Sequence, residues 1–132
     1  MIVDASVAFK WVVREEGSDA AAAILGREDL RAPSLILVEL GNALWKKGMR
    51  GELGDRSAFA AQLAIVASFV TIDDAVEHVT RAVEMALILE HAVYDCLYLA
   101  LADHRDDRLL TADAKFYAKV ARSEWRETIE QL

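Results

Sequence analysis

The sequence predicts an α/β protein in which helices cover a parallel sheet. Short runs of apolar and β-branched residues alternate along the chain with longer helical patterns. Hydrophobic residues make up 55% of the chain, which supplies a core, and six glycines and one proline leave little room for long loops. A length of 132 residues favours one domain, which we expect to span residues 1–132.

The first half of the chain opens with a strand. Residues 1–3 are all apolar and predict a short buried strand, and residues 6–14, apolar with a basic end, predict a helix. Residues 18–25 contain a run of alanines and predict a second helix that stops at Gly26. A short extended piece in LRAPS precedes a helix that starts at Pro33 or Ser34 and runs to about residue 47, closed by Gly48 and Gly51.

The second half continues the alternation. Residues 55–69 have a helical pattern, and FVTID at residues 69–73 is a β-branched strand that ends in an acidic pair. Helices are expected at residues 75–89, 94–102 and 114–122, and RLLTAD at residues 108–113 predicts a strand followed by a turn. The tail to residue 132 is ambiguous, and its ETIEQL segment is compatible with an edge strand. Strands separated by helices indicate βα units, without defining the order of the strands.

Charge and cysteine content exclude some classes of function. The formal net charge of −7 argues against broad non-specific binding of nucleic acid, although metal ions can carry positive charge into an acidic enzyme site. Cys96 lies in an apolar stretch and is expected to be a buried hydrophobe, so neither a disulfide nor a CxxC zinc site is available. Asp4 interrupts the opening apolar run without a charged leader, and no apolar stretch reaches membrane-spanning length, so we expect a cytoplasmic protein without a membrane segment.

Four of the 22 acidic residues lie in apolar surroundings, where a solvated surface position is a poor explanation. Asp4 follows the apolar residues 1–3, and Asp113 follows RLLT in a similar way. Glu39 lies in SLILVELGNALWK and Asp95 lies in HAVYDCLYLALA, and both segments are apolar on most sides of a helix. A carboxylate that is ionised in such surroundings needs a partner, because isolated burial of charge is very costly.

Each of these carboxylates also has a structural explanation. Asp4, Asp95 and Asp113 all suit the N-cap position of a helix. Glu39 on an exposed helix face would have the amide of Asn42 as an i,i+3 partner. These alternatives stay open for each residue considered alone.

Taken together, the four carboxylates favour a metal site. Two of them end strands of one parallel sheet and so emerge at the same edge, and the other two lie near the amino ends of helices that can pack over that edge. Converging carboxylates repel one another unless some are protonated or a cation is present. Mg²⁺ or Mn²⁺ fits an oxygen-only donor set, because no histidine or cysteine cluster accompanies it. Phosphodiester hydrolysis is the chemistry that most often needs such a centre.

Weaker signals surround these residues. His91 precedes Asp95 by four residues and is near the predicted site, although a helix-start or surface position is the simpler explanation. Two basic clusters accompany the Asp4 and Glu39 segments, either as solvated helix ends or as groups that steer phosphate. They comprise Lys10, Arg14, Lys46, Lys47 and Arg50.

Four motifs carry a family resemblance when their order and spacing are taken together: IVDASV, APSLILVELGNALWK, HAVYDCLYLALA and LLTADAKFY. With them the chain resembles the PIN-domain ribonucleases, specifically the VapC-type toxins of prokaryotic type II toxin–antitoxin pairs. The resemblance implies a three-layer α/β/α PIN-like fold with a central parallel β-sheet. It places the family's acidic quartet on Asp4, Glu39, Asp95 and Asp113.

The resemblance also implies roles for these residues. Asp4, Asp95 and Asp113 would be the main metal ligands, and Glu39 would bind the metal or help to deprotonate the attacking water. The polar residues expected to support them are Ser6, Asn42 and Thr111. The implied activity is Mg²⁺- or Mn²⁺-dependent endoribonuclease cleavage of RNA, with products that carry 5′-phosphate and 3′-hydroxyl ends.

The expected partners are a VapB-like antitoxin and a second copy of the chain as a homodimer. An apolar surface on residues 7–13, with Phe9 and Trp11, and on residues 35–45 would receive the antitoxin. The homodimer would use residues 75–102. The alternative function is a catalytically inactive PIN-fold interaction module that binds a partner protein.

Overall fold

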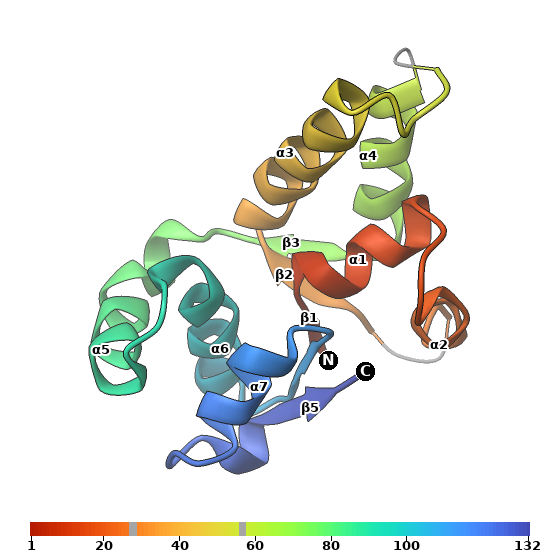
Figure 1. Cartoon of the computed structure of the whole chain (residues 1–132). Helices are drawn as coiled ribbons and strands as arrows, with labels where there is room; N and C mark the ends of the chain where they lie inside the picture. The colour runs from red at the N-terminus through yellow and green to blue at the C-terminus, as the bar shows by residue number, and fades with distance from the viewer. Residues whose placement is uncertain (27–28, 56–57) are drawn as a thin grey trace.

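The computed structural model of the chain describes residues 1–26, 29–55 and 58–132, and these residues form a five-stranded sheet in the order β3-β2-β1-β4-β5 (Figure 1). Every neighbouring pair of strands is parallel. The strands are β1 (Ile2–Val3), β2 (Arg31–Pro33), β3 (Thr71–Asp73), β4 (Leu109–Thr111) and β5 (Ile129–Gln131). All of them fall in segments predicted to be extended, and the ambiguous tail supplies the edge strand β5.

The helices follow the predicted segments with shifted ends. They are α1 (Ala5–Val12), α2 (Ser18–Ala23), α3 (Leu35–Met49), α4 (Phe59–Phe69), α5 (Val79–Leu89), α6 (Val93–Arg105) and α7 (Ala114–Val120). The segment predicted at residues 75–89 is divided into a 3₁₀ turn, η2 (Val76–His78), and α5, and a further turn, η3 (Arg126–Thr128), precedes β5. Part of the helix predicted at residues 55–69 falls on residues 56 and 57, which lie outside the described residues.

Gly48 has a different role from the one expected. It lies inside α3 and is buried, instead of closing the helix near residue 47. A Cβ atom at this position would lie 2.9 Å from Cζ of Phe59, at the start of α4, so the missing side chain lets the two helices approach closely. Gly51, with a φ of +70°, takes the left-handed conformation in the turn after α3.

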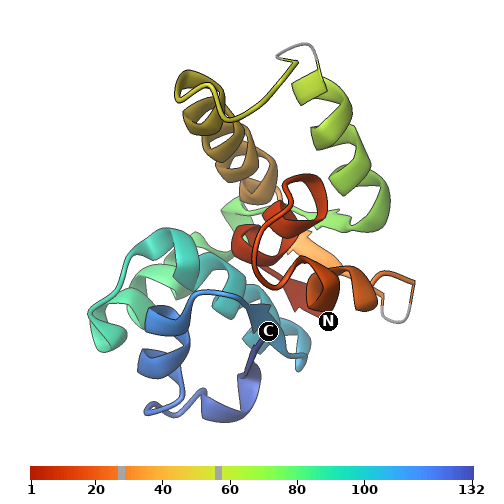
Figure 2. The same ribbon diagram turned by 45° about the vertical axis from the view of Figure 1, so that its right-hand side comes forward.

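Helices cover the sheet on both faces, as the two views in Figures 1 and 2 show. The chain moves outward from β1 to β2 and β3, and then passes back to β4 and β5 on the other side of β1. Because crossovers between parallel strands are right-handed, this reversal places α1–α4 on one face and α5–α7 on the other. The result is a three-layer α/β/α fold.

The core is centred on β1 and α6. Ile2 and Val3 are fully buried in the middle strand, and α6 packs against β1, β2 and β4. Residues 96–102 of α6 are buried without interruption, which explains why this helix is apolar on all sides. Cys96 is one of these residues, as predicted, and its burial raises the pKa of the thiol to about 11.

Within the described ranges, no single helix is both long enough and apolar enough to cross a membrane. Residues 76–89 and 93–105 meet the length and composition criteria only as a pair, and that pair is bent by 114°.

Candidate active site

The site lies at the carboxyl edge of the sheet, where the strand order reverses. β1 and β4 are neighbours, yet the chain leaves β1 toward β2 and leaves β4 toward β5, so a crevice opens between their ends. Asp4 directly follows β1, and its backbone N–H still donates to the carbonyl of Leu110 in β4 at 3.3 Å. Asp113 follows β4 by two residues. The topology therefore brings the two strand-end aspartates to one place.

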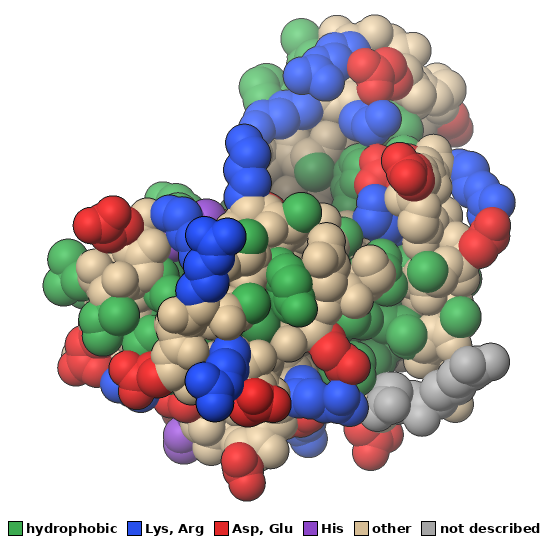
Figure 3. Space-filling view, turned by 60° about the horizontal axis from the view of Figure 1, so that its bottom comes forward, with side chains coloured by type: hydrophobic (Ala, Val, Ile, Leu, Met, Phe, Trp, Pro, Cys, Tyr) green, Lys and Arg blue, Asp and Glu red, His purple; other side chains and the backbone are tan. Residues whose placement is uncertain are grey.

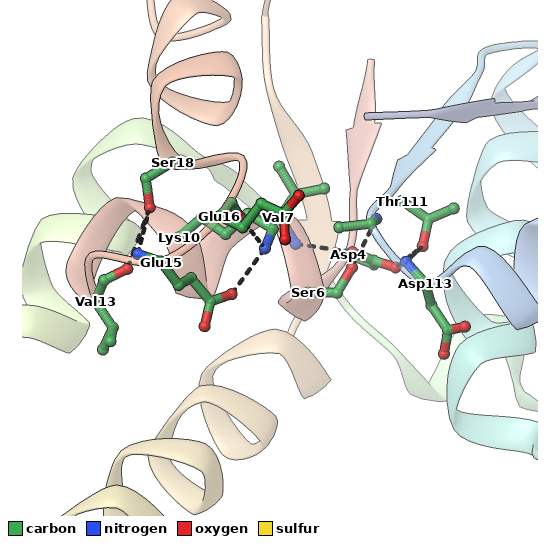
Figure 4. Close-up of polar contacts among 11 residues, drawn as sticks. Asp4, Ser6, Val7, Lys10, Val13, Glu15, Glu16, Ser18, Thr111 and Asp113 are labelled. Atoms are coloured by element: carbon green, nitrogen blue, oxygen red, sulfur yellow. Dashed lines mark hydrogen bonds and ion pairs between the residues drawn. The ribbon is translucent and has the colours of Figure 1, made fainter. Parts of the chain in front are cut away.

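Hydroxyl groups hold the carboxylate of Asp4 from both sides (Figure 4). Ser6 Oγ donates to Oδ1 of Asp4 at 2.5 Å, and the hydroxyl of Thr111 donates to Oδ2. The backbone N–H of Val7 also donates to Oδ1, at 3.1 Å, so Asp4 caps α1 in addition. The contact between Ser6 and the first aspartate was expected from the sequence, whereas the bond from Thr111 to Asp4 was not predicted.

The same hydroxyls tie the end of β4 to the end of β1. Ser6 Oγ accepts from the backbone N–H of Ala112 at 2.8 Å, and Thr111 Oγ1 accepts from that of Asp113 at 3.0 Å. Each hydroxyl therefore donates to Asp4 and accepts from the β4–α7 turn. This arrangement fixes the position of Asp113 relative to Asp4.

Burial dominates the electrostatics of Asp4. The side chain is almost completely shielded from solvent, and desolvation raises the pKa of its carboxyl from 3.8 to about 6. The hydrogen bonds from Ser6, Thr111 and Val7 oppose this change, and the negative charge of Asp95 adds to it.

Glu39 lies in the second turn of α3 and accepts a hydrogen bond from the hydroxyl of Tyr98 on α6. Burial raises the pKa of Glu39, the charges of Asp95 and Asp4 raise it further, and the bond from Tyr98 opposes the change. Tyr98 was not predicted from the sequence as a residue of the site. Its place three residues after Asp95, on the same face of a helix, was the available signal.

Asp95 lies in the first turn of α6, although Ala92 and not Asp95 is the N-cap residue of that helix. His91 donates from Nε2 to Oδ2 of Asp95 at 2.7 Å, and the imidazole stacks on the ring of Phe116 with centroids 4.7 Å apart. Burial raises the pKa of Asp95, His91 opposes this change, and the charge of Asp113 adds to it. His91 directly precedes Ala92, the N-cap residue of α6, so the helix-start explanation is correct, and the residue also contacts the site through Asp95.

Asp113 is the N-cap residue of α7, because its Oδ1 accepts from the backbone N–H groups of Lys115 and Phe116 at 2.8 and 3.0 Å. The capping explanation is therefore correct for Asp4 and Asp113 and wrong for Asp95. A cap uses only part of the acceptor capacity of a carboxylate, so capping and metal binding are compatible for these two residues. Asn42 is exposed on α3. It takes part in none of the hydrogen bonds described around the carboxylates, so its supporting role stays a prediction.

The four carboxylates thus influence one another electrostatically while they come from four different elements. Asp95 acts on Asp4 and on Glu39, and Asp113 acts on Asp95. As the side chains stand, however, no three Asp, Glu, His or Cys residues of the described chain are arranged to hold one metal ion. Metal coordination at this site therefore needs a movement of side chains and stays a prediction.

An open cavity of about 570 Å³ adjoins the site at Asp113. Ser6 and Asp113 form the part of its wall that belongs to the site, and Phe9, Lys10 and Lys115 form much of the rest. Lys10 is held within the wall, where Nζ lies 2.7 Å from both Oε1 of Glu15 and the carbonyl oxygen of Glu16 (Figure 4). The site is therefore accessible from outside and has basic side chains on its border.

Comparison with known proteins agrees with this architecture. The PIN domain family matches residues 1–122, and the chain belongs to that family. The fold is also similar to the crystal structure of PAE2754 from Pyrobaculum aerophilum, with a TM-score of 0.72 and 22% identity. That match covers 98% of this chain and 87% of the other.

Two similar curated proteins are more specific. Ribonuclease VapC3 from Pyrobaculum aerophilum is 30% identical over 122 residues, which cover 90% of this chain and 93% of that protein. Ribonuclease VapC1 from Mycobacterium tuberculosis is 35% identical over 124 residues, which cover 89% of this chain and 88% of that protein. The resemblance to VapC proteins is therefore confirmed along most of the chain.

Proposed function

We propose that the protein is a metal-dependent endoribonuclease that acts as the toxin of a VapBC-type pair. The observation that carries this proposal is the gathering of four carboxylates at the topological switch point, where three of them have raised pKa values. Their mutual repulsion is relieved when a cation binds. The names of the VapC relatives support RNA as the substrate.

The chemistry of the donor set fits Mg²⁺ or Mn²⁺. All four groups are carboxylates, which hard divalent cations prefer. Asp4, Asp95 and Asp113 would hold the ion, and Glu39 would bind it or accept a proton from the attacking water. Ser6 and Thr111 keep Asp4 in place. A bound divalent ion at such a site supplies a nucleophile at neutral pH and stabilises the charge that develops on the phosphate.

A cleavage assay with matched variants tests the proposal. Protein stripped with EDTA is expected to cut single-stranded RNA only after Mg²⁺ or Mn²⁺ is added, leaving 5′-phosphate and 3′-hydroxyl ends that end-specific sequencing detects. Asp95→Asn is expected to abolish cleavage, whereas Asp19→Asn, the same change at an exposed side chain of α2, leaves it intact. Metal-independent cleavage, or full activity of Asp95→Asn, would contradict the proposal.

For the antitoxin, the proposed docking surface is the exposed face of α3. Val38, Trp45 and Met49 lie on this face at helical spacing and are 68%, 56% and 64% exposed. Figure 3 shows α3 and α4 as an arm above a hollow, with Lys and Arg side chains along its edge. Trp11, which was also expected on this surface, is partly buried, and its indole donates to the carbonyl of Ala21 in α2, so its contribution stays a prediction.

Binding measurements test this surface. Trp45→Ala is expected to weaken binding of the proposed VapB-like antitoxin at least tenfold, because an aromatic anchor that becomes buried at the interface dominates such contacts. Tyr94→Ala, which removes an exposed aromatic ring from α6 instead, serves as the matched control. Equal affinity of both variants and the unchanged protein would exclude the α3 face as the docking surface.

For the homodimer, the proposed contact is the outer face of α5 and η2. Val76, Val79, Val83 and Leu87 are exposed and follow one another at spacings of three and four residues, so they form one apolar stripe. Burial of this stripe removes apolar surface from water in the dimer. Leu87→Asp is expected to give a monomer in light-scattering measurements of molar mass, and a dimer that survives this change would contradict the assignment.

The second candidate function is an inactive PIN-fold module that only binds a partner protein. The exposed apolar faces of α3 and α5 favour it. The cleavage assay separates the two functions, because an inactive module binds the antitoxin without cutting RNA at any metal concentration.

A further inference from the structure

The hydrogen bond between Tyr98 and Glu39 links the two helical layers of the protein. Glu39 belongs to α3 on one face of the sheet, and Tyr98 belongs to α6 on the other face, 59 residues later in the chain. The ring of Tyr98 is only 1% exposed, so packing fixes the position of the hydroxyl. The donor is therefore part of the rigid core, while its acceptor lies in the site.

The hydroxyl of Tyr98 can act only as a donor toward Glu39. An ionised carboxylate has only acceptor sites, so the phenol O–H supplies the proton of this hydrogen bond. The bond occupies Oε2 of Glu39. Oε1 of the same carboxylate stays available for a cation or a water molecule.

Glu39 needs such an anchor more than the other three carboxylates do. Two hydroxyls and a backbone amide hold Asp4, an imidazole holds Asp95, and two backbone amides hold Asp113. Glutamate has one more rotatable bond than aspartate and loses more conformational entropy when a ligand orders it. Among the described hydrogen bonds, the one from Tyr98 is the only one that reaches the Glu39 carboxylate.

We propose that Tyr98 is a positioning residue that holds the Glu39 carboxylate in the orientation in which Oε1 serves the divalent cation. This inference rests on the proposed function. Tyr98 does not touch the ion or the RNA. It acts through Glu39, because it restricts the rotamers of the Glu39 side chain before the cation binds.

Calorimetric titration of Mn²⁺ into metal-free protein tests the inference. Tyr98→Phe, which keeps the ring and removes the hydroxyl, is expected to weaken Mn²⁺ binding about tenfold, at the lower end of the usual range for groups that orient metal ligands. Tyr94→Phe makes the same change on an exposed ring of α6 and is expected to bind Mn²⁺ normally. In the Glu39→Gln background, Tyr98→Phe is expected to cause no further loss.

A cleavage assay separates positioning from general damage. The Tyr98→Phe variant is expected to need more Mn²⁺ for half-maximal RNA cleavage and to recover the wild-type rate when Mn²⁺ saturates. If Tyr98→Phe fails to fold, Tyr98→Met, which fills the apolar space with a flexible side chain that has no hydroxyl, takes its place.

The outcomes distinguish this inference from the proposed function. If Glu39→Gln weakens Mn²⁺ binding and Tyr98→Phe does not, the role of Tyr98 is overturned and the proposed function stands. If Tyr98→Phe weakens binding equally in the presence and absence of the Glu39 carboxylate, Tyr98 acts on the fold and not through Glu39. Failure of the unchanged protein to bind Mn²⁺ overturns both proposals.

Discussion

The stability of the metal-free protein is expected to fall as the pH rises, because Asp4 is buried. The pKa of its carboxyl is about 6 in the folded protein and near the ordinary value of 3.8 in the unfolded chain. Below about pH 3 both states hold the proton, and ionisation of Asp4 costs the folded state nothing. Between pH 4 and 6 the unfolded chain releases a proton that the folded protein retains, so the free energy of unfolding decreases through this range.

The magnitude follows from the size of the shift. One unit of pKa corresponds to roughly 1.4 kcal/mol, so a shift of about two units destabilises the metal-free protein by about 3 kcal/mol above pH 6. That amount is a large fraction of the total stability of a typical domain, which is about 5–15 kcal/mol. A cation that neutralises the site is expected to restore it.

Urea unfolding in EDTA at pH 4.5, 5.5, 6.5 and 7.5 measures this effect. Asp4→Asn cannot ionise, so the decrease between pH 4.5 and pH 7.5 is expected to shrink by about 2 kcal/mol, because about 1 kcal/mol of the total effect is already present at pH 4.5. The lost acceptor bonds lower stability by a similar amount at every pH. Asp107, whose pKa is lowered, has an opposite pH dependence that is present in both proteins and cancels in the comparison. The Asp19→Asn control retains the wild-type slope. Identical slopes for Asp4→Asn and the unchanged protein would refute the reasoning.

Three further outcomes are expected. Asp95→Asn keeps or raises the free energy of unfolding in EDTA, because it removes one of the repelling charges; a clear loss in the same urea assay would mean that Asp95 is structural. Thr111→Val lowers stability by about 1.5–3 kcal/mol, since the buried carboxylate of Asp4 loses a donor, and an unchanged urea midpoint would contradict this. Gly48→Ala is expected to lower the melting temperature, because the added Cβ would lie 2.9 Å from the ring of Phe59 in α4, at a cost of about 1–3 kcal/mol. Gly41→Ala, whose Cβ would have no neighbour within 4 Å, is expected not to lower it.

Local patterns in the sequence predicted the elements because the forces that select them act over a few residues. β-Branched and apolar runs located the strands, and helical periodicity located the helices between them. The ends were less accurate because they depend on packing. Gly48 lies inside α3 and faces the ring of Phe59, and nothing near Gly48 in the sequence indicates that contact.

The four carboxylates could be recognised from the sequence because a buried charge in an apolar segment is costly unless it is paired or hydrogen-bonded. Their local partners were visible too: Ser6 lies two residues from Asp4, and both are near the end of one strand. Tyr98 was missed, because a tyrosine within an apolar helix has the same pattern as any core residue.

Local patterns in the sequence were enough to locate the strands and helices, to select candidate side chains for the chemistry, and to indicate the family of the chain. The strand order β3-β2-β1-β4-β5 could not be read from the sequence, and neither could the contact between Asp4 and Thr111, which lie 107 residues apart. The bond between Glu39 and Tyr98 across the two helical layers was likewise decided only by the tertiary structure. The physical reason is that helix and strand preferences arise between neighbours along the chain, whereas these hydrogen bonds exist only after long-range packing brings distant segments together.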